Sequence, residues 1–85
     1  MSSSVEHQAE EVGRAARADF DRGIAPSQIV RQLELKGYGL IFLMLVARHG
    51  FGIQLLEAKS AGIYFRGGRL VDPDGFDAYI REHVR

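Results

Sequence analysis

Seven consecutive apolar residues, at positions 40–46, place the strongest constraint on how this 85-residue chain folds. Glycines flank the run and β-branched residues are few, so we predict a helix over residues 40–49 that ends at Gly50. The run spans nearly two helical turns, so every side of this helix is hydrophobic and must be covered. The other helices of the chain can supply that cover, or another molecule can, most simply a second copy.

Glycine separates the other amphipathic segments of the chain. An apolar stripe with helical spacing predicts a first helix over residues 5–22, which stops at Gly23. Pro26 suits the first turn of a second helix, and Gly37 ends it. A fourth helix is expected over residues 55–61, again ending at the glycine that follows.

The pattern changes after this fourth helix. Two short β-prone runs, residues 63–66 and 69–71, are joined by a Gly-Gly pair, which favours a type I′ hairpin. Asp72 followed by Pro73 predicts the capped start of a last helix. The predicted fold is therefore mainly α: a compact cluster of about five short helices with one short β-hairpin before the last helix.

Composition limits the classes of function. Eleven basic and eleven acidic residues give a net charge of zero, and a hydrophobic content of 46% argues against wholesale disorder. The chain has no cysteine, which excludes disulfides and thiolate catalysis and fits a cytoplasmic setting. No signal peptide or membrane-spanning run is evident. We expect one helical domain over residues 5–85, after a flexible amino terminus at residues 1–4.

No catalytic or cofactor motif is present in the sequence. His7, His49 and His83 are far apart, and none forms a ligand pair one helical turn apart. The aspartates that follow residue 71 lack the ligand pattern of a calcium loop. We therefore expect no enzyme activity, no metal site and no cofactor.

The sequence RHGFGIQLLEAK follows the apolar run, at residues 48–59. It resembles the hallmark of the C-terminal domain of the bacterial ribosomal stalk protein, a run like R-x-x-T-G-L-G-L-K-E-A-K. Without gaps, the residues that coincide are Arg48, Gly52, Leu55, Glu57, Ala58 and Lys59. In that family the two-helix surface recruits translation factors, so the resemblance implies a helical hairpin used for protein binding in a small bacterial protein. Leu45 stands where the family has a lysine, and the helix over residues 5–22 replaces the family's opening strand.

These features predict a non-catalytic protein-binding module that acts through the helical hairpin of residues 40–61. The expected partner is another protein or a second copy in a homodimer, with no membrane involved. We expect the apolar contacts and the charged rim to come from Leu40, Phe42, Met44, Leu45, Arg48 and Lys59.

Two other classes of function fit the same sequence. In a winged-helix interpretation, the hairpin is the wing, and its residues Arg66 and Arg69 contact nucleic-acid phosphates. In the alternative interpretation, these two arginines only keep a short hairpin soluble. Positions 22–69 contain seven basic and two acidic residues and are the basic part of the chain. This excess of positive charge could attract an acidic partner, or the charges could be scattered over a solvated surface. An immunity or inhibitor protein that neutralises one partner would have the same composition. The sequence names neither the partner nor the oligomeric state.

Overall fold

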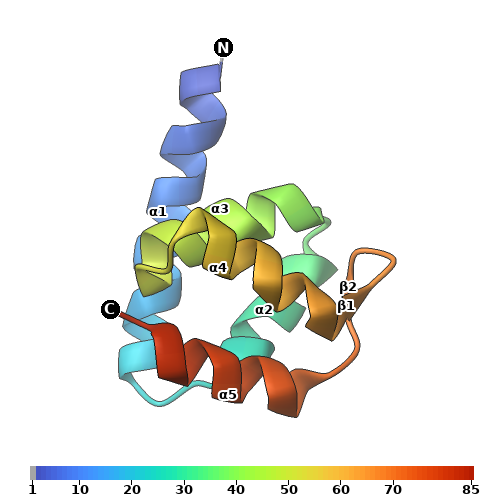
Figure 1. Cartoon of the computed structure of the whole chain (residues 1–85). Helices are drawn as coiled ribbons and strands as arrows, with labels where there is room; N and C mark the ends of the chain where they lie inside the picture. Colours follow the sequence, from blue (N-terminus) through green and yellow to red (C-terminus); the bar gives the residue numbers. More distant parts are fainter. Residues whose placement is uncertain (1) are drawn as a thin grey trace.

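The computed structural model describes the backbone of residues 2–85 and the side chains of residues 4–85. These residues form a mainly helical fold with five α-helices and one two-stranded antiparallel hairpin before the last helix (Figure 1). The fold class expected from the sequence is therefore confirmed. In chain order the elements are α1 (Ser2–Asp21), α2 (Pro26–Leu35), α3 (Leu40–Phe51), α4 (Leu55–Ser60), the 3-10 helix η1 (Ala61–Tyr64), β1 (Phe65–Arg66), β2 (Arg69–Leu70) and α5 (Pro73–His83).

Helix α1 begins at Ser2, three residues earlier than expected. The helix ends as the sequence indicates: Gly23 has a φ of 97°, and the Ile24 N–H donates to the Asp19 carbonyl at 3.0 Å. Figure 1 shows the amino-terminal end of α1 extending beyond the other helices.

Helix α3 continues to Phe51, so the prediction that it ends at Gly50 is wrong. Gly50 is buried against α1, and a Cβ atom placed on it would lie 2.6 Å from the Gly13 carbonyl oxygen. The helix ends one residue before Gly52, whose φ of 67° is the left-handed conformation that glycine adopts most readily. Gly50 therefore marks a close contact between helices, while Gly52 marks the end of the helix.

Helix α4 ends at Ser60, and the chain continues as a 3-10 helix through Gly62 where a stop was expected. Ala58 and Ala61 are 5% and 4% exposed, so continued helical winding keeps both small side chains against the core. The first two residues of the predicted first strand consequently belong to η1.

The hairpin is shorter than expected but has the expected turn. Phe65 lies opposite Leu70, and Arg66 lies opposite Arg69. The two glycines between the strands have φ values of 59° and 80°, as a type I′ turn requires. Glu34 of α2 accepts the Leu70 N–H at 2.8 Å and ties the hairpin to that helix.

The capped start of α5 is confirmed, since the Asp72 carboxylate accepts the Gly75 N–H at 3.1 Å. One hydrophobic core is shared by all five α-helices, η1 and β2. Within residues 2–85, no helix has the length and apolar character needed to cross a membrane. The buried hydrophobic side chains are Ala9, Ala16, Ile29, Val30, Leu33, Leu43, Val46, Phe51, Ile53, Ala58, Ala61, Leu70, Phe76 and Ile80.

Candidate functional site

The sides of helix α3 are covered unequally by the rest of the chain. Leu43 and Val46 are 5% and 3% exposed and belong to the core. A second side lies against α1, where His49 Nε2 is 3.0 Å from the Glu6 carboxylate. Ile41, in contrast, is 76% exposed. The fold thus covers two sides of the apolar helix and leaves a third side open.

Two rows of side chains border this open side. Within each row the residues are spaced by three and four positions, so they lie along one face of a helical segment. Leu56 and Ile63 in the second row are about as exposed as Ile41 in the first, at 74% and 77%. Neither row contains an acidic residue. We call them the paired rows: Ile41, Met44 and Arg48 on α3, and Leu56, Lys59 and Ile63 on α4 and η1.

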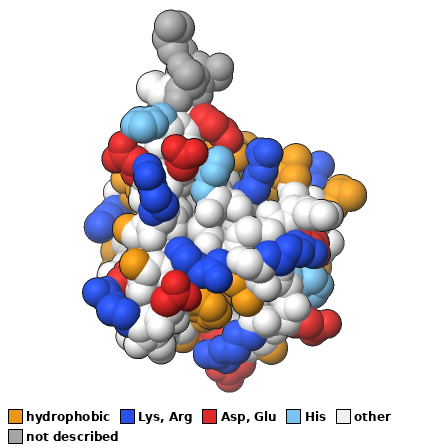
Figure 2. All heavy atoms as spheres, turned by 90° about the vertical axis from the view of Figure 1, so that its left-hand side faces the viewer, with side chains coloured by type: hydrophobic (Ala, Val, Ile, Leu, Met, Phe, Trp, Pro, Cys, Tyr) orange, Lys and Arg blue, Asp and Glu red, His pale blue; other side chains and the backbone are white. Residues whose placement is uncertain are grey.

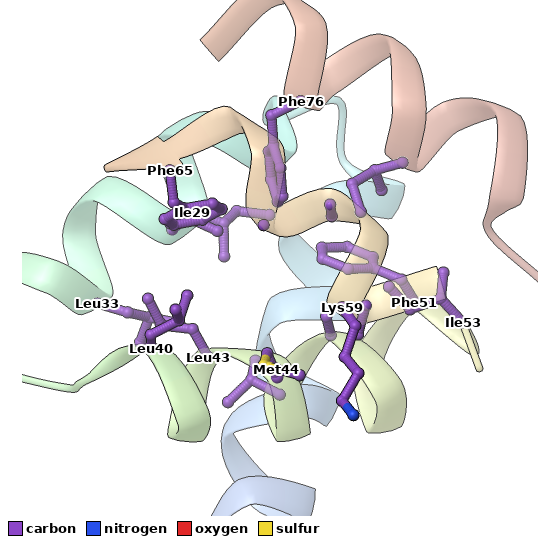
Figure 3. A pocket seen from close by; sticks show the side chains of 17 residues that line it. Ile29, Leu33, Leu40, Leu43, Met44, Phe51, Ile53, Lys59, Phe65 and Phe76 are labelled. Carbon is purple, nitrogen blue, oxygen red and sulfur yellow. The ribbon is translucent and has the colours of Figure 1, made fainter. Parts of the chain in front are cut away.

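An apolar cavity of about 200 Å³ lies between the paired rows, and their middle residues, Met44 and Lys59, both line it (Figure 3). Its inner wall is formed by buried side chains of the core. Figure 3 shows Leu40, Met44 and Lys59 on one side of the cavity, with Phe65 and Phe76 across from them. The open side of α3 therefore leads into a cavity between helices.

Among the described residues that line the cavity, Lys59 is the single charged one. Its side chain is exposed, and within the described residues its amine has no ion-pair partner. In Figure 3 this amine points away from the aromatic rings. A lysine commonly lays its methylene stem along an apolar surface and keeps its charge in water. The cavity therefore combines an apolar interior with one positive charge at its edge.

The carboxylate of Glu57, although close to Lys59 in sequence, is held by other groups. Arg85 donates to its two oxygens at 2.6 and 2.9 Å, and the Gln54 N–H donates to it at 2.8 Å. These hydrogen bonds, first from Arg85 and then from Gln54, lower the pKa of Glu57 from 4.5 to about 2. The same pair raises the pKa of Arg85. Because Arg85 also donates to the Gly52 and Phe51 carbonyls at 3.2 and 2.9 Å, it links the end of α3 to α4.

The structure divides the predicted contact residues between two sides of α3. Leu40, Met44 and Lys59 meet at the cavity, as the helical-hairpin hypothesis requires. Phe42 lies away from them, and its ring stacks on Tyr38 with centroids 4.4 Å apart. The predicted site is therefore brought together only in part.

The remaining two predicted residues, Leu45 and Arg48, lie between the open side of α3 and the side that faces α1. Leu45 is half-buried. It is one helical turn from Ile41 and Arg48 of the first row, and equally one turn from Phe42 and His49. Arg48 is 52% exposed, and its guanidinium is 3.9 Å from the Glu6 carboxylate. A surface pair at this separation holds its partners weakly, so Arg48 remains accessible at the end of the first row.

Three exposed members of the paired rows, Ile41, Leu56 and Ile63, were not identified from the sequence. A signal for two of them was present in α4 and η1. Ala58 and Ala61 are small and three residues apart, which marks the buried face of this segment. Leu56 and Ile63 fall outside that face, so their exposure follows from the period of the helix. No comparable signal existed for Ile41, since every position around it is apolar.

Residues of the stalk-like motif have roles in the turn between α3 and α4. Gly52 adopts the left-handed conformation at the end of α3, and Glu57 binds both Arg85 and the start of α4. Ala58 is buried. These positions therefore serve the geometry of a helical hairpin, and the family resemblance stays a prediction.

The two arginines of the predicted wing lie opposite each other beside the hairpin turn. Arg66 and Arg69 are exposed, and within the part of the chain that the structure describes neither has an ion-pair partner. The helix that would enter a DNA groove, α4, has only six residues and exposes Leu55 and Leu56 by 48% and 74%. Base edges are read mainly by polar side chains, so this helix is better suited to an apolar partner.

Comparison with known proteins finds no matching family model, no matching curated protein and no matching solved structure. Among the described residues, no group of three or more His, Asp or Glu side chains is placed to hold a metal ion. The paired rows and the cavity between them are therefore the candidate site.

Proposed function

We propose that this chain is a non-catalytic protein-binding module whose paired rows bind an acidic, amphipathic segment of another protein. One observation carries the proposal: two rows of apolar and basic side chains, exposed except for half-buried Met44, flank an apolar cavity and contain no acidic residue. An amphipathic helix that lies in a groove buries its apolar face there, and acidic side chains beside that face complement the cations of the groove.

The size of the site favours a macromolecule over a small ligand alone. Pockets for small molecules usually have volumes of about 300–1,000 Å³ and enclose most of the ligand. The cavity here, at about 200 Å³, is smaller, while Ile41, Leu56 and Ile63 extend the apolar surface well outside it. An exposed apolar patch with a polar edge is typical of a protein interface.

Charge favours a different protein over a second copy of this chain. A two-fold symmetric dimer presents the same patch from both subunits. Both copies would then bring Arg48 and Lys59 to the interface, neither row contains a carboxylate, and the Glu6 carboxylate near Arg48 is 3.9 Å away on α1. A partner that supplies carboxylates has no such repulsion.

The proposal is tested by selecting peptides from a displayed random library on the purified protein and measuring their affinities by calorimetry. We expect selected peptides to carry apolar residues at helical spacing together with Asp or Glu. Leu56→Glu should weaken their binding at least about tenfold, because it places a charge in the centre of the interface. The matched control is Leu35→Glu on α2, where the native leucine is 81% exposed and lies outside the rows.

Two results would contradict the proposal. The first is equal binding of the selected peptides by the Leu56→Glu and Leu35→Glu variants. The second is a stable dimer in light scattering, near twice 9.5 kDa, that Leu56→Glu dissociates, since this would assign the rows to self-association.

A further inference from the structure

The cavity between the paired rows has a closed end and an accessible end. Its deep wall is formed by buried core residues such as Leu43, Phe51 and Ile80. The lining residues of α3 that are only half-buried, Leu40, Met44 and Ala47, are spaced by four and three positions and form one stripe along the helix. Exposed Lys59 of α4 and half-buried Gly62 of η1 also line the cavity. The cavity therefore opens between α3 and the α4–η1 segment.

The volume and lining of the cavity define the size and polarity of the group it can take. Every lining residue except Lys59 is apolar or glycine. An engineered apolar cavity of about 150 Å³ lined by Leu, Ile and Phe stays dry and binds benzene. At about 200 Å³, this cavity accommodates a phenyl ring with one or two further carbons.

The charge at the opening defines a second requirement. Within the described part of the chain, Lys59 is the single cation of the lining and no acidic residue lines the cavity. The nearby carboxylate of Glu57 is bound to Arg85. A group that enters between the rows with a carboxylate near its outer end brings that carboxylate to the Lys59 amine. A ligand with an amine at the same place would meet a like charge.

We propose that the cavity is a binding site for an apolar group of about the size of a phenyl ring joined to a carboxylate. In the partner segment, this group is a bulky apolar anchor residue with an acidic residue beside it. The statement that this group belongs to a partner protein rests on the proposed function. The cavity chemistry itself can be measured with small molecules on the protein alone.

The first experiment titrates the protein with phenylacetate, phenylacetamide and phenethylamine at neutral pH and follows the side-chain methyl signals of Leu43 and Met44 by NMR. These probes share one ring and differ in charge. We expect phenylacetate to bind about two- to fivefold more tightly than the neutral amide, which is the range of a single exposed ion pair, and the amine to bind most weakly. Absence of methyl shifts at millimolar probe, or equal affinities for all three, would overturn the proposal.

A matched pair of lysine variants tests the origin of the charge preference. Lys59→Gln should remove the advantage of phenylacetate over phenylacetamide while leaving the affinity for the amide unchanged. Lys36→Gln is the control, because Lys36 is also exposed but lies at the end of α2, outside the cavity lining. Retention of the preference in Lys59→Gln would overturn the role of Lys59.

A cavity-filling variant separates this inference from the proposed function. Ala47→Leu adds side-chain volume at the half-buried opening of the cavity and should abolish binding of both the probes and the selected peptides. If this variant does not fold, Ala58→Val fills the cavity from another wall and takes its place. If the peptides bind Ala47→Leu as well as the native protein but lose affinity for Leu56→Glu, the inference is wrong and the proposed function stands. If the probes bind the native cavity and no peptide depends on Leu56, the source is a free carboxylic acid and the proposed function is wrong.

Discussion

Helix α3 has two very different neighbours on its two sides. Toward α1, small residues allow the two helices to approach closely: a Cβ atom on Gly13 would lie 2.9 Å from the Gly50 nitrogen. Toward α4, large apolar side chains such as Leu40 and Met44 leave a cavity of about 200 Å³ between the helices. One apolar helix therefore serves as a structural contact on one side and as an open surface on the other.

Polar groups show the same contrast between the two sides. At the α1 contact, Arg17 donates to the Gly50 and Arg85 carbonyls at 3.3 and 2.7 Å, and His49 meets Glu6. On the face that carries α1, acidic and basic side chains are interspersed (Figure 2). In the paired rows the cation Lys59 has no partner among the described residues. The polar groups of the first side are therefore paired with one another, whereas the Lys59 amine on the second side can pair with a carboxylate of another molecule.

The largest effect is expected where the two helices touch. Gly50→Ala should lower the free energy of unfolding by about 1–3 kcal/mol, because the new methyl group would lie 2.6 Å from the Gly13 carbonyl oxygen and force α1 and α3 apart. Urea unfolding followed by circular dichroism measures this change.

Gly62→Ala is the matched control for this substitution. Gly62 is also helical and has no atom within 4 Å of an added Cβ, so alanine there should leave stability unchanged or raise it slightly. Equal losses in both variants would show that α1 and α3 are not tightly packed at Gly50.

An intermediate effect is expected from pH at the link between α3 and α4. Hydrogen bonds from Arg85 and from the Gln54 N–H lower the pKa of Glu57 from 4.5 to about 2. Ionised Glu57 therefore stabilises the folded state above pH 4.5, and this stabilisation is lost as the pH falls toward 2. Glu57→Gln should therefore be less stable than the native protein at pH 6, and the difference should disappear near pH 2. Urea midpoints across this pH range measure both curves.

Glu10→Gln provides the comparison for this pH dependence. Glu10 lies on α1 in an exposed pair with Arg14, at an N···O distance of 3.9 Å, so its removal should change the pH dependence little. A pH dependence that is unchanged by Glu57→Gln would show that the Arg85 link does not hold in solution.

The smallest effect on stability is expected in the paired rows. Leu56→Ser and Ile63→Ser should each change the free energy of unfolding by less than about 0.5 kcal/mol, because these side chains are 74% and 77% exposed and have few contacts to lose. The same urea experiment applies. A loss above about 1 kcal/mol would mean that these residues pack within the chain rather than wait for a partner.

Much of the local structure was predictable, because its signals lie within a few residues of one another. The Gly-Gly pair predicted the hairpin turn, and Asp72 with Pro73 predicted the start of α5. The end of α3 was predicted wrongly. Gly50 looks like a helix stop in sequence, yet it is a contact residue, and only the approach of Gly13 from thirty-seven positions away reveals this.

The candidate site was predictable only in outline. The apolar run and Lys59 were identified as part of a binding surface, but Phe42 and Leu45 were grouped with them although neither lines the cavity, and the ring of Phe42 stacks on Tyr38 instead. An all-apolar helix carries no periodic signal that tells its covered sides from its open one. The position of a neighbouring helix is needed to make that distinction.

Helix periodicity, glycine and proline act locally, so the sequence was enough to predict the helical class, the order of the elements, and the turns at Gly23 and at Gly67 and Gly68. The folded structure was needed to show which side of α3 is open and that a cavity lies behind it. It was also needed to show that Arg85 holds Glu57 while Lys59 remains unpaired within the described residues. These features depend on contacts between residues distant in the chain, and side-chain packing in three dimensions sets them.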